Sequence, residues 1–233
     1  MMKSGFRVIL VRHGHTQWNL DNRFTGWSEV PLSETGLAEA KQAGQQLAAK
    51  NMRFDEAHVS VLARTEQALQ AMLQAAGHPE IPVHSSWRLN ERHYGALQGM
   101  NKQEIFSTYG ESQSYKWWRG YETAPPPLDM DDPRHPRFST LYGDLPAADL
   151  PTSESLAQCK QRLIPYWEET LRPAIQSGKS LIVVSHGNTL RCLRMYMENI
   201  DPQAIQKVEI PLGAPFIYYF DHNMQFDRIE WLS

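Results

Sequence analysis

Two apolar segments, far apart in the sequence, each end in a histidine followed by a glycine. Residues 6–11 (FRVILV) are short and rich in β-branched side chains, and they run directly into Arg12-His13-Gly14. Residues 180–185 (SLIVVS) repeat the pattern and run into His186-Gly187. Both segments have the length and composition of buried strands. A buried strand that ends in such residues delivers them to the edge of an α/β sheet where ligands bind.

These residue types together allow phosphoryl transfer. Arginine binds phosphate through two parallel hydrogen bonds, and glycine lets a ligand approach the backbone closely. A neutral imidazole can attack phosphorus and carry the phosphoryl group. Arg12 and Arg64 can stabilise the negative charge of that phosphoryl group, so no metal is required. One histidine at a strand end is more often only a satisfied polar residue. Two histidines in matching contexts, with arginines beside them, favour a reactive pair.

The remaining sequence predicts strands that alternate with helices. Ser33 is expected to cap a helix that continues to about Lys50. Further strands are expected near 57–61, 81–87, 215–220 and 226–231, and further helices at 63–76, 102–109, 153–175 (kinked or interrupted at Pro165) and 189–199. This alternation predicts an α/β fold, a three-layer α/β/α sandwich with a mostly parallel central sheet. At least one edge strand, the C-terminal one, is expected to run antiparallel, and Arg64 is expected at the sheet edge that carries His13.

Residues 89–149 lack a regular pattern over most of their length. Their prolines argue against long helices there, and their many aromatic residues argue against disorder. We expect an ordered insertion that lies over the active-site edge of the sheet. The whole chain, 1–233, is expected to form a single domain of which this insertion is the lid.

Composition narrows the class of protein. The chain has 233 residues, 41% of them hydrophobic, and a formal net charge of -3, which argues against nucleic-acid or membrane-surface binding. Cys159 and Cys192 lie in helical patterns without a pairing motif and are expected to be buried and reduced. The first residues do not resemble a signal peptide, and apolar runs stay short of the roughly 18 residues that a membrane span needs. A cytoplasmic location is therefore expected.

The segment LVRHGHTQWN (10–19) resembles the first motif of the histidine phosphatase superfamily. The segments NRFTGWSEVPLSETG, SVLART, LNERHYGALQGMNK and SHGNTLR extend the resemblance, in the same order, to the phosphoglycerate mutases of that superfamily that depend on 2,3-bisphosphoglycerate. The resemblance implies interconversion of 3-phosphoglycerate and 2-phosphoglycerate, a step of glycolysis and gluconeogenesis, through a phosphohistidine and without a metal. It implies phosphorylated sugar acids as small-molecule partners, and it leaves a homo-oligomer open.

The resemblance also implies a role for each matching residue. His13 corresponds to the nucleophile, and Glu91 to the general acid/base that exchanges a proton with the substrate hydroxyl. Arg12, Arg64 and His186 correspond to residues that bind the transferring phosphoryl group. The matching substrate-binding positions are Asn19, Thr25, Gly26, Arg92, Tyr94, Lys102, Arg119, Gly187 and Asn188.

His15 is the first departure from the family pattern, because it stands where the family has a glutamate. A carboxylate beside the pocket is thereby lost. His15 could change the environment of the nucleophile or only form a hydrogen bond to the backbone. His13 and His15 together also suggest a metal site. Such a site would need further Cys, His, Asp or Glu ligands at defined spacing.

The second departure is Trp118, which stands at the first of two adjacent arginines of the family. The loss of this donor is expected to weaken binding of the doubly phosphorylated cofactor, with Lys116 replacing part of the charge. Alternatively, the tryptophan is a packing residue of the lid.

The third departure lies at the end of the sequence. Typical mutases continue past RIEWLS into a tail that helps close the site, and without closure water competes for the phosphoryl group. This favours an alternative reading, a phosphatase of the same superfamily, unless residues 112–138 cover the site alone. A third reading is a non-catalytic phosphate-binding relative, but binding alone would need neither His13 nor Glu91.

Overall fold

The structure, a computed structural model, describes residues 5–78 and 80–232. Its centre is one sheet with the strand order β3-β2-β4-β1-β5-β6. The strands are β1 (Phe6–Arg12), β2 (Glu56–Val59), β3 (Val83–Ser85), β4 (Leu181–Ser185), β5 (Pro215–Phe220) and β6 (Phe226–Trp231). The residues at the extreme N-terminus, part of the segment for which no signal peptide is expected, lie outside the described range.

The sheet is mostly parallel, as the alternation of strands and helices predicts. β1 pairs in parallel with β4, and β2 pairs in parallel with both β3 and β4. β6 is the edge strand and pairs antiparallel with β5, but β5 is also antiparallel to β1. The strand that runs against the others is therefore β5, one position inside the edge, and β6, which forms a hairpin with it, has the direction of β1.

Several of the helices begin directly after a residue whose side chain caps them. The helices are α1 (Gln17–Leu20), α2 (Glu34–Ala49), α3 (Ala63–Ala76), α4 (Lys102–Tyr109), α5 (Glu111–Arg119), α6 (Leu156–Tyr166), α7 (Arg172–Gln176) and α8 (Gly187–Glu198). Ser33 caps α2 by accepting a hydrogen bond from the amide of Gly36, as predicted. Pro165 lies inside α6, and a π-helical segment, Trp167–Leu171, carries the winding on into α7. The expected long helix thus changes its winding after Pro165 without ending there.

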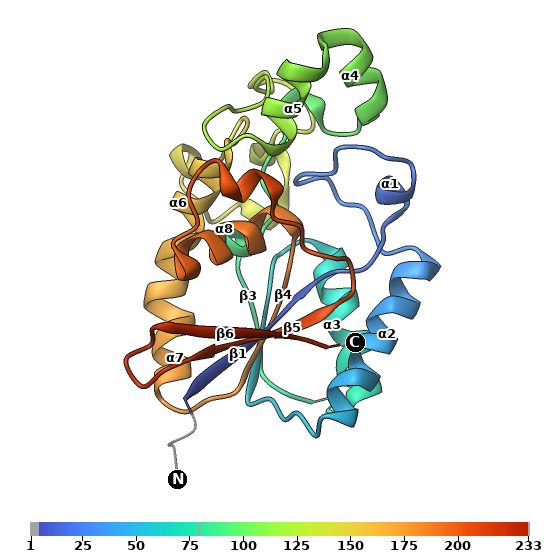
Figure 1. Ribbon diagram of the computed structural model, residues 1–233. Coiled ribbons are helices and arrows are strands. Elements are labelled where there is room, and N and C mark those ends of the chain that lie inside the picture. The colour runs from blue at the N-terminus through green and yellow to red at the C-terminus, as the bar shows by residue number, and fades with distance from the viewer. Residues whose placement is uncertain (1–4, 79, 233) are drawn as a thin grey trace.

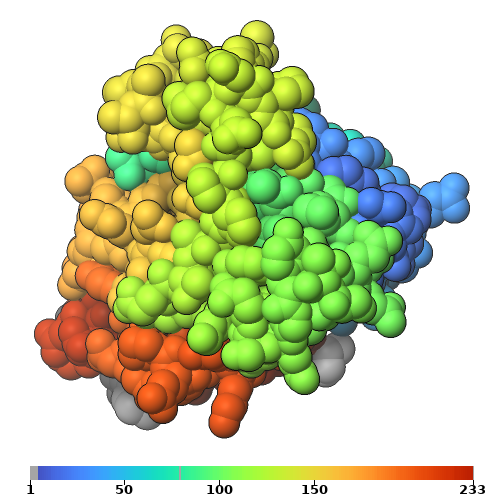
Figure 2. Space-filling view, turned by 90° about the horizontal axis from the view of Figure 1, so that it is seen from above, coloured from blue at the N-terminus to red at the C-terminus, as the bar shows by residue number. Residues whose placement is uncertain are grey.

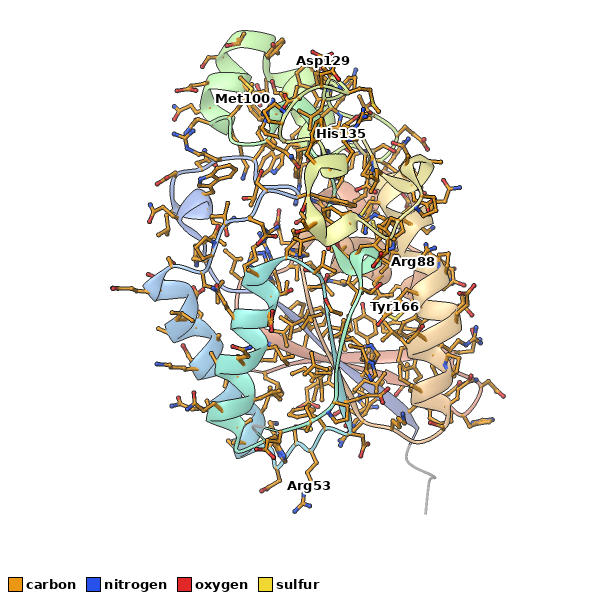
Figure 3. All side chains as sticks on the ribbon, turned by 180° about the vertical axis from the view of Figure 1, so that it is seen from behind. Arg53, Arg88, Met100, Asp129, His135 and Tyr166 are labelled. Carbon is orange, nitrogen blue, oxygen red and sulfur yellow. The ribbon has the colours of Figure 1, made fainter. Side chains whose placement is uncertain are left out.

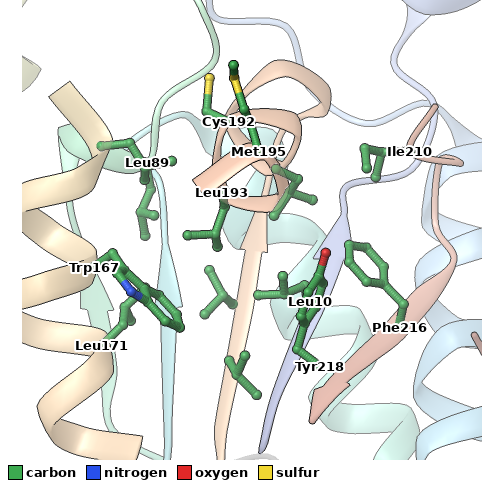
Figure 4. Close-up of a cluster of buried hydrophobic side chains, with 14 of the residues drawn as sticks. Leu10, Leu89, Trp167, Leu171, Cys192, Leu193, Met195, Ile210, Phe216 and Tyr218 are labelled. Atoms are coloured by element: carbon green, nitrogen blue, oxygen red, sulfur yellow. The ribbon is translucent and has the colours of Figure 1, made fainter. Parts of the chain in front are cut away.

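Helices cover both faces of the sheet (Figure 1), with α2 and α3 on one face and α6 and α8 on the other. Successive residues of a strand point to opposite faces, so Ile9 and Val11 pack in the cluster that includes α2 and α3. Leu10 packs in the other cluster, which also contains Trp167 and Leu171 (Figure 4). Both faces of β1 are therefore in the core, which holds the residues that follow β1 rigidly.

The segment 89–149 lies beyond the carboxyl ends of the central strands and includes α4 and α5 (Figure 1). In Figure 3, Met100, Asp129 and His135 mark this end of the molecule, and Arg53 marks the opposite end. The proline-rich part of segment 89–149 forms only short 3₁₀ turns, among them Pro136–Phe138. This agrees with the expectation that the prolines exclude long helices. The sequence did not predict α5.

The two cysteines agree with the expectation from the sequence. Cys159 and Cys192 are both buried and free. Within the described residues, no helix combines the length and the apolar character required to cross a membrane.

Candidate active site

The register of the central strands brings His13 and His186 together. Arg12 lies opposite Ser185 in the parallel pair of β1 and β4, and the amide of His13 donates to the carbonyl of Ser185 at 3.0 Å. Each histidine is the next residue after its strand. Their ring centroids are 5.0 Å apart in an edge-to-face arrangement, so the predicted juxtaposition at the sheet edge is present.

His13 is held with one ring nitrogen available for reaction. Its Nδ1 lies 2.7 Å from the carbonyl oxygen of Gly14, and only a protonated nitrogen can donate to a carbonyl. In the neutral ring, Nε2 is then the nitrogen with the free electron pair. Burial, followed by the positive charges of Arg64 and Arg12, holds the pKa of His13 well below its ordinary 6.5. The imidazole is therefore neutral at physiological pH, as a nucleophile requires.

His186 is fixed through the opposite ring nitrogen. Its Nε2 lies 2.8 Å from the hydroxyl of Ser60, which is itself 2.8 Å from the hydroxyl of Thr65. The Nδ1 of His186 is buried and has no hydrogen-bond partner in the described part of the chain. Burial and the charge of Arg64 hold the pKa of His186 well below 6.5. A neutral imidazole with one unused polar atom thus lies directly against His13.

Arg12 and Arg64 are anchored by carbonyl groups, and each leaves its Nε donor unpaired. Arg64 donates to the carbonyls of Gly26 at 2.7 Å and Ser28 at 2.9 Å, and Arg12 donates to the carbonyl of Ile210 at 2.8 Å. The Nε atoms of both arginines are buried without a protein partner. Because buried N–H groups are nearly always paired, these two donors are available to an anion in the pocket.

Glu91 is a carboxylate that lines the same pocket as His13, Arg12 and Arg64. Its Oε1 accepts hydrogen bonds from the backbone amides of Arg92 at 2.8 Å and Asn188 at 3.1 Å. These two amides fix the carboxylate at the start of α8, beside Gly187. The residue is buried, with 8% of its surface exposed. Its position is therefore defined by the backbone on two sides.

A pocket opens above these residues and collects most of the predicted substrate-binding positions. It is lined by Arg12, His13, Asn19, Arg23, Phe24, Thr25, Gly26, Arg64, Glu91, Tyr94, Lys102, Trp118, Arg119, Gly187, Asn188, Arg191, Glu209 and Ile210. His186 lies behind the pocket wall, against His13. Arg92 is not part of the lining, because its guanidinium donates to the carbonyls of Trp117 and Gly120 and so holds the end of α5.

Trp118 is both a pocket residue and a packing residue of the segment above the sheet. It lines the pocket, and it packs edge-to-face against Phe106 and Tyr115 in the segment above the sheet. Its ring also faces the ammonium of Lys102, which lies 5.4 Å from the ring centroid, a cation–π distance. Lys116 does not line the pocket; it lies at a separate hollow with Glu111 and Gln206. It therefore supplies no replacement for the missing arginine.

Arg191 is a pocket residue that the sequence reasoning missed. It donates to the side-chain oxygen of Asn188 at 2.7 Å and to the carbonyl of Ile205 at 2.6 Å, and its Nε is buried without a partner. Burial lowers its pKa to about 10. The signal was present, since Arg191 follows Asn188 by three residues on one helix and so shares its face. Arg23 and Glu209 also line the pocket and were also missed.

The glycines after the two histidines allow close contacts within the protein. A Cβ at Gly14 would lie 2.5 Å from the carbonyl oxygen of Gly36, in the first turn of α2. A Cβ at Gly187 would lie 3.1 Å from the guanidinium carbon of Arg12. The sequence reasoning assigned both glycines to the approach of a ligand. In the structure the missing side chains also leave room for α2 at Gly14 and for the guanidinium of Arg12 at Gly187, and Gly187 lines the pocket.

His15 is bound to a carboxylate. Both its backbone amide and its Nδ1 lie within hydrogen-bond distance of Glu39, at 2.8 Å and 2.7 Å. The carboxylate that the sequence pattern lacks next to Gly14 is thus supplied by α2. Across residues 5–78 and 80–232, no three histidine, cysteine or acidic side chains are grouped so that they could hold a metal ion.

The comparisons with known proteins agree with this arrangement. The model of the histidine phosphatase superfamily, branch 1, matches residues 8–228. A 2,3-bisphosphoglycerate-dependent phosphoglycerate mutase from Hamiltonella defensa subsp. Acyrthosiphon pisum (strain 5AT) is 46% identical over 219 residues, which cover 94% of this chain and 88% of that protein. The chain belongs to the histidine phosphatase superfamily.

Solved structures of this superfamily share the fold. A mycobacterial glucosyl-3-phosphoglycerate phosphatase in complex with VO3 superposes with a TM-score of 0.73 at 19% identity, over 97% of this chain and 98% of that chain. A putative alpha-ribazole-5'-P phosphatase from Escherichia coli str. K-12 substr. MG1655 gives a TM-score of 0.71 at 19% identity, over 98% and 96%. At such identities the likeness establishes the α/β/α architecture and nothing finer.

Proposed function

We propose that this chain is a phosphoglycerate mutase that interconverts 3-phosphoglycerate and 2-phosphoglycerate through a phosphohistidine at His13. The observation that carries the proposal is the neutral His13, fixed through Nδ1 and surrounded by the unpaired donors of Arg12 and Arg64. The relative that is 46% identical over nearly the whole chain bears the name of that activity and supports the choice of substrate.

The residues divide the reaction between them. The electron pair of His13 Nε2 attacks phosphorus, and the bond from phosphorus to the ester oxygen breaks. Arg12, Arg64 and His186 stabilise the charge on the transferring group, and Glu91 donates its proton to the leaving oxygen. This attack follows an earlier transfer on the primed enzyme, in which Glu91 takes the proton from the free hydroxyl of 3-phosphoglycerate as that oxygen attacks the phosphorus held on His13 and the bond from phosphorus to Nε2 breaks. The attack by Nε2 then removes the phosphoryl group from the other oxygen and leaves 2-phosphoglycerate.

The unpaired donors of the pocket fit a doubly phosphorylated ligand. When bound, 2,3-bisphosphoglycerate supplies the phosphoryl group that primes His13. The inner phosphate would lie against Arg12 and Arg64, and a second anionic group would lie toward Lys102 and Arg119, which line the outer part of the pocket. Water must be excluded for the mutase outcome, and the segment that carries Trp118 covers this side of the molecule (Figure 2).

A phosphatase of the same superfamily is the second candidate. Trp118 favours it, because the residue stands at a position where the family resemblance expects an arginine and so removes a donor to the second anionic group. Weaker retention of the bisphosphorylated species gives water more time to act as the acceptor. The catalytic residues are the same in both cases, and only the acceptor of the phosphoryl group differs.

One assay distinguishes the two. Purified protein is incubated with 3-phosphoglycerate, a trace of 2,3-bisphosphoglycerate and a chelator, and 2-phosphoglycerate and inorganic phosphate are followed together. The mutase proposal predicts rapid formation of 2-phosphoglycerate with little inorganic phosphate, and loss of activity by at least about 1000-fold in His13→Asn. Release of inorganic phosphate without 2-phosphoglycerate would establish the phosphatase instead, and full activity in His13→Asn would reject both.

A further inference from the structure

Glu209 is a carboxylate of the pocket for which the proposed reaction has no role. The pocket is lined by six basic side chains and two acidic ones, and the other acidic residue is Glu91. Glu209 lies between the short helix η7 (Ala204–Lys207) and β5. Its side chain is 71% exposed, and its Oε1 forms an ion pair with Nη2 of Arg119. The negative charge of Glu209 thus lies at the exposed side of a pocket whose other charged side chains are mostly basic.

The backbone around Glu209 is fixed by two arginines of the same pocket. On one side, the carbonyl of Val208 accepts a hydrogen bond from Arg119 at 3.3 Å. On the other side, the buried Ile210 accepts one from Arg12 at 2.8 Å. In Figure 2 the segment around residue 209 borders the one around residue 119. The exposed carboxylate is therefore held next to Arg119 by its own backbone.

The inner and outer parts of the pocket differ in the partners of their arginines. At the inner end, the Nε atoms of Arg12 and Arg64 have no protein partner. At the outer end, Arg119 donates through Nε to the carbonyl of Gln206 at 3.1 Å and through Nη2 to Glu209. An incoming phosphate finds free donors at the inner end. A second anionic group finds Arg119 already bound to a carboxylate.

We propose that Glu209 is a specificity-determining residue that competes with the second anionic group of the substrate for Arg119. The proposal rests on the proposed function, because it assumes a ligand with two anionic groups. Such a ligand must displace Glu209 from Arg119 or accept a like charge beside it. The cost is greatest for a second phosphate, which carries more charge than a carboxylate, so Glu209 lowers the affinity for 2,3-bisphosphoglycerate more than that for 3-phosphoglycerate.

Equilibrium binding tests this competition. The His13→Asn variant cannot accept a phosphoryl group, so 2,3-bisphosphoglycerate binds to it without reacting. Calorimetric titrations of this variant with and without Glu209→Gln measure the Kd of 2,3-bisphosphoglycerate, of 3-phosphoglycerate and of inorganic phosphate. We expect Glu209→Gln to lower the Kd of 2,3-bisphosphoglycerate by about fivefold, since exposed ion pairs are worth up to about 1 kcal/mol. The Kd of 3-phosphoglycerate should fall less, that of inorganic phosphate should stay unchanged, and salt should reduce the differences.

Glu104→Gln is the matched control. Glu104 is exposed on α4 and does not line the pocket, so its substitution changes the net charge equally without freeing Arg119. An equal effect of the two substitutions would show that only net charge matters and would overturn the proposal. Weaker binding of 2,3-bisphosphoglycerate by Glu209→Gln would also overturn it, because Glu209 would then orient Arg119 for the ligand.

The same titrations separate this inference from the proposed function. If the wild-type protein forms no 2-phosphoglycerate but Glu209→Gln tightens binding of 2,3-bisphosphoglycerate, the proposed function fails and the competition stands. If the wild-type protein is an active mutase and the Kd is equal with and without Glu209, the competition fails alone. If neither His13→Asn protein binds 2,3-bisphosphoglycerate, the competition is also rejected.

Discussion

The two histidines at the centre of the site are the same kind of side chain held in opposite ways. His13 is bound through Nδ1 to the carbonyl of Gly14, and His186 through Nε2 to the hydroxyl of Ser60. Each ring therefore keeps the other nitrogen unused, so His13 presents Nε2 and His186 presents Nδ1. This difference supports the proposal that His13 is the nucleophile, because its proton position is fixed by a carbonyl that can only accept.

Glu91 is the residue whose substitution separates proton transfer from binding. In Glu91→Gln the side-chain oxygen still accepts from the amides of Arg92 and Asn188, so the geometry is kept while the acid is lost. We expect kcat to fall by about 100- to 10,000-fold with KM nearly unchanged. Steady-state assays of 2-phosphoglycerate formation measure both constants, and Glu91→Asp, which retains an acid, should lose less. A higher KM with kcat intact would make Glu91 a binding residue.

At the scale of elements, one side chain of α6 organises the turn that carries Glu91. Arg162 is 7% exposed, and it donates to the carbonyls of Arg88 at 2.8 Å and of Glu91 at 3.2 Å. Its charge is balanced by Glu154, whose Oε1 lies 2.7 Å from its Nε. Glu154 in turn accepts from the amide of His93 at 2.8 Å. The buried ion pair of Arg162 and Glu154 thus joins α6 to both ends of the turn that carries Glu91.

Arg162→Gln tests this connection. The substitution leaves the buried carboxylate of Glu154 without its partner, which costs about 3–5 kcal/mol in the free energy of unfolding. We expect urea denaturation to show a loss of this size, and kcat to fall because the turn with Glu91 is released. A loss below about 1 kcal/mol with normal kcat would contradict the role given to Arg162.

A surface ion pair provides the control for Arg162. Arg172 and Glu168 are four residues apart, with side chains 35% and 32% exposed, and they are 2.8 Å apart. Arg172→Gln removes the same kind of charge from the same stretch of helix. Because exposed pairs contribute at most about 1 kcal/mol, its effect on unfolding should be small and its effect on kcat absent.

Local sequence signals account for the elements that were predicted well. The predicted helix at 63–76 and the strands at 215–220 and 226–231 agree with α3, β5 and β6, because apolar periodicity and turn residues define them. α5 begins at Gly110 without a side-chain cap, and the sequence did not predict it. It is held by tertiary packing of Trp117 and Trp118 against the cluster of Phe24, Tyr94, Leu97 and Ile105, which no local pattern reveals.

The same distinction applies to the candidate site. His13 and His186 could be located because each ends a strand, and strand pairing brings strand ends together. Glu209 could not, since it is one acidic residue in an irregular segment and reaches the pocket only through the path of that segment. Arg92 matches the family motif, but its guanidinium is used to hold the backbone at the end of α5.

At the scale of the whole molecule, several histidines are buried in their neutral form. Burial lowers the pKa of His58 to about 4 and that of His93 to about 3. Below pH 6.5 the unfolded chain binds protons at these positions, whereas the folded chain does not until about pH 4 and about pH 3. The free energy of unfolding must therefore decrease as the pH falls through this window.

The acid sensitivity can be measured by urea unfolding at pH 7.0 and pH 5.5, followed by tryptophan fluorescence. Each of these two histidines should remove about 1 kcal/mol of stability over this interval, and His13 and His186 act in the same direction. His58→Gln should reduce the difference between the two pH values by the share of one histidine. Equal stability at both pH values would show that these histidines are not neutral in the folded protein.

The position of β1 in the sheet has a consequence for how the protein acquires activity during synthesis. β1 is made before both of its neighbours, β4 and β5, which begin after residue 180. Contacts between such distant segments form slowly, because a long loop must close before they can be made. A growing chain therefore carries His13 long before β1 can pair with β4 and β5, and the candidate site cannot form until these later strands have emerged. The return of catalytic activity during refolding would therefore mark the step at which β1 pairs with β4 and β5.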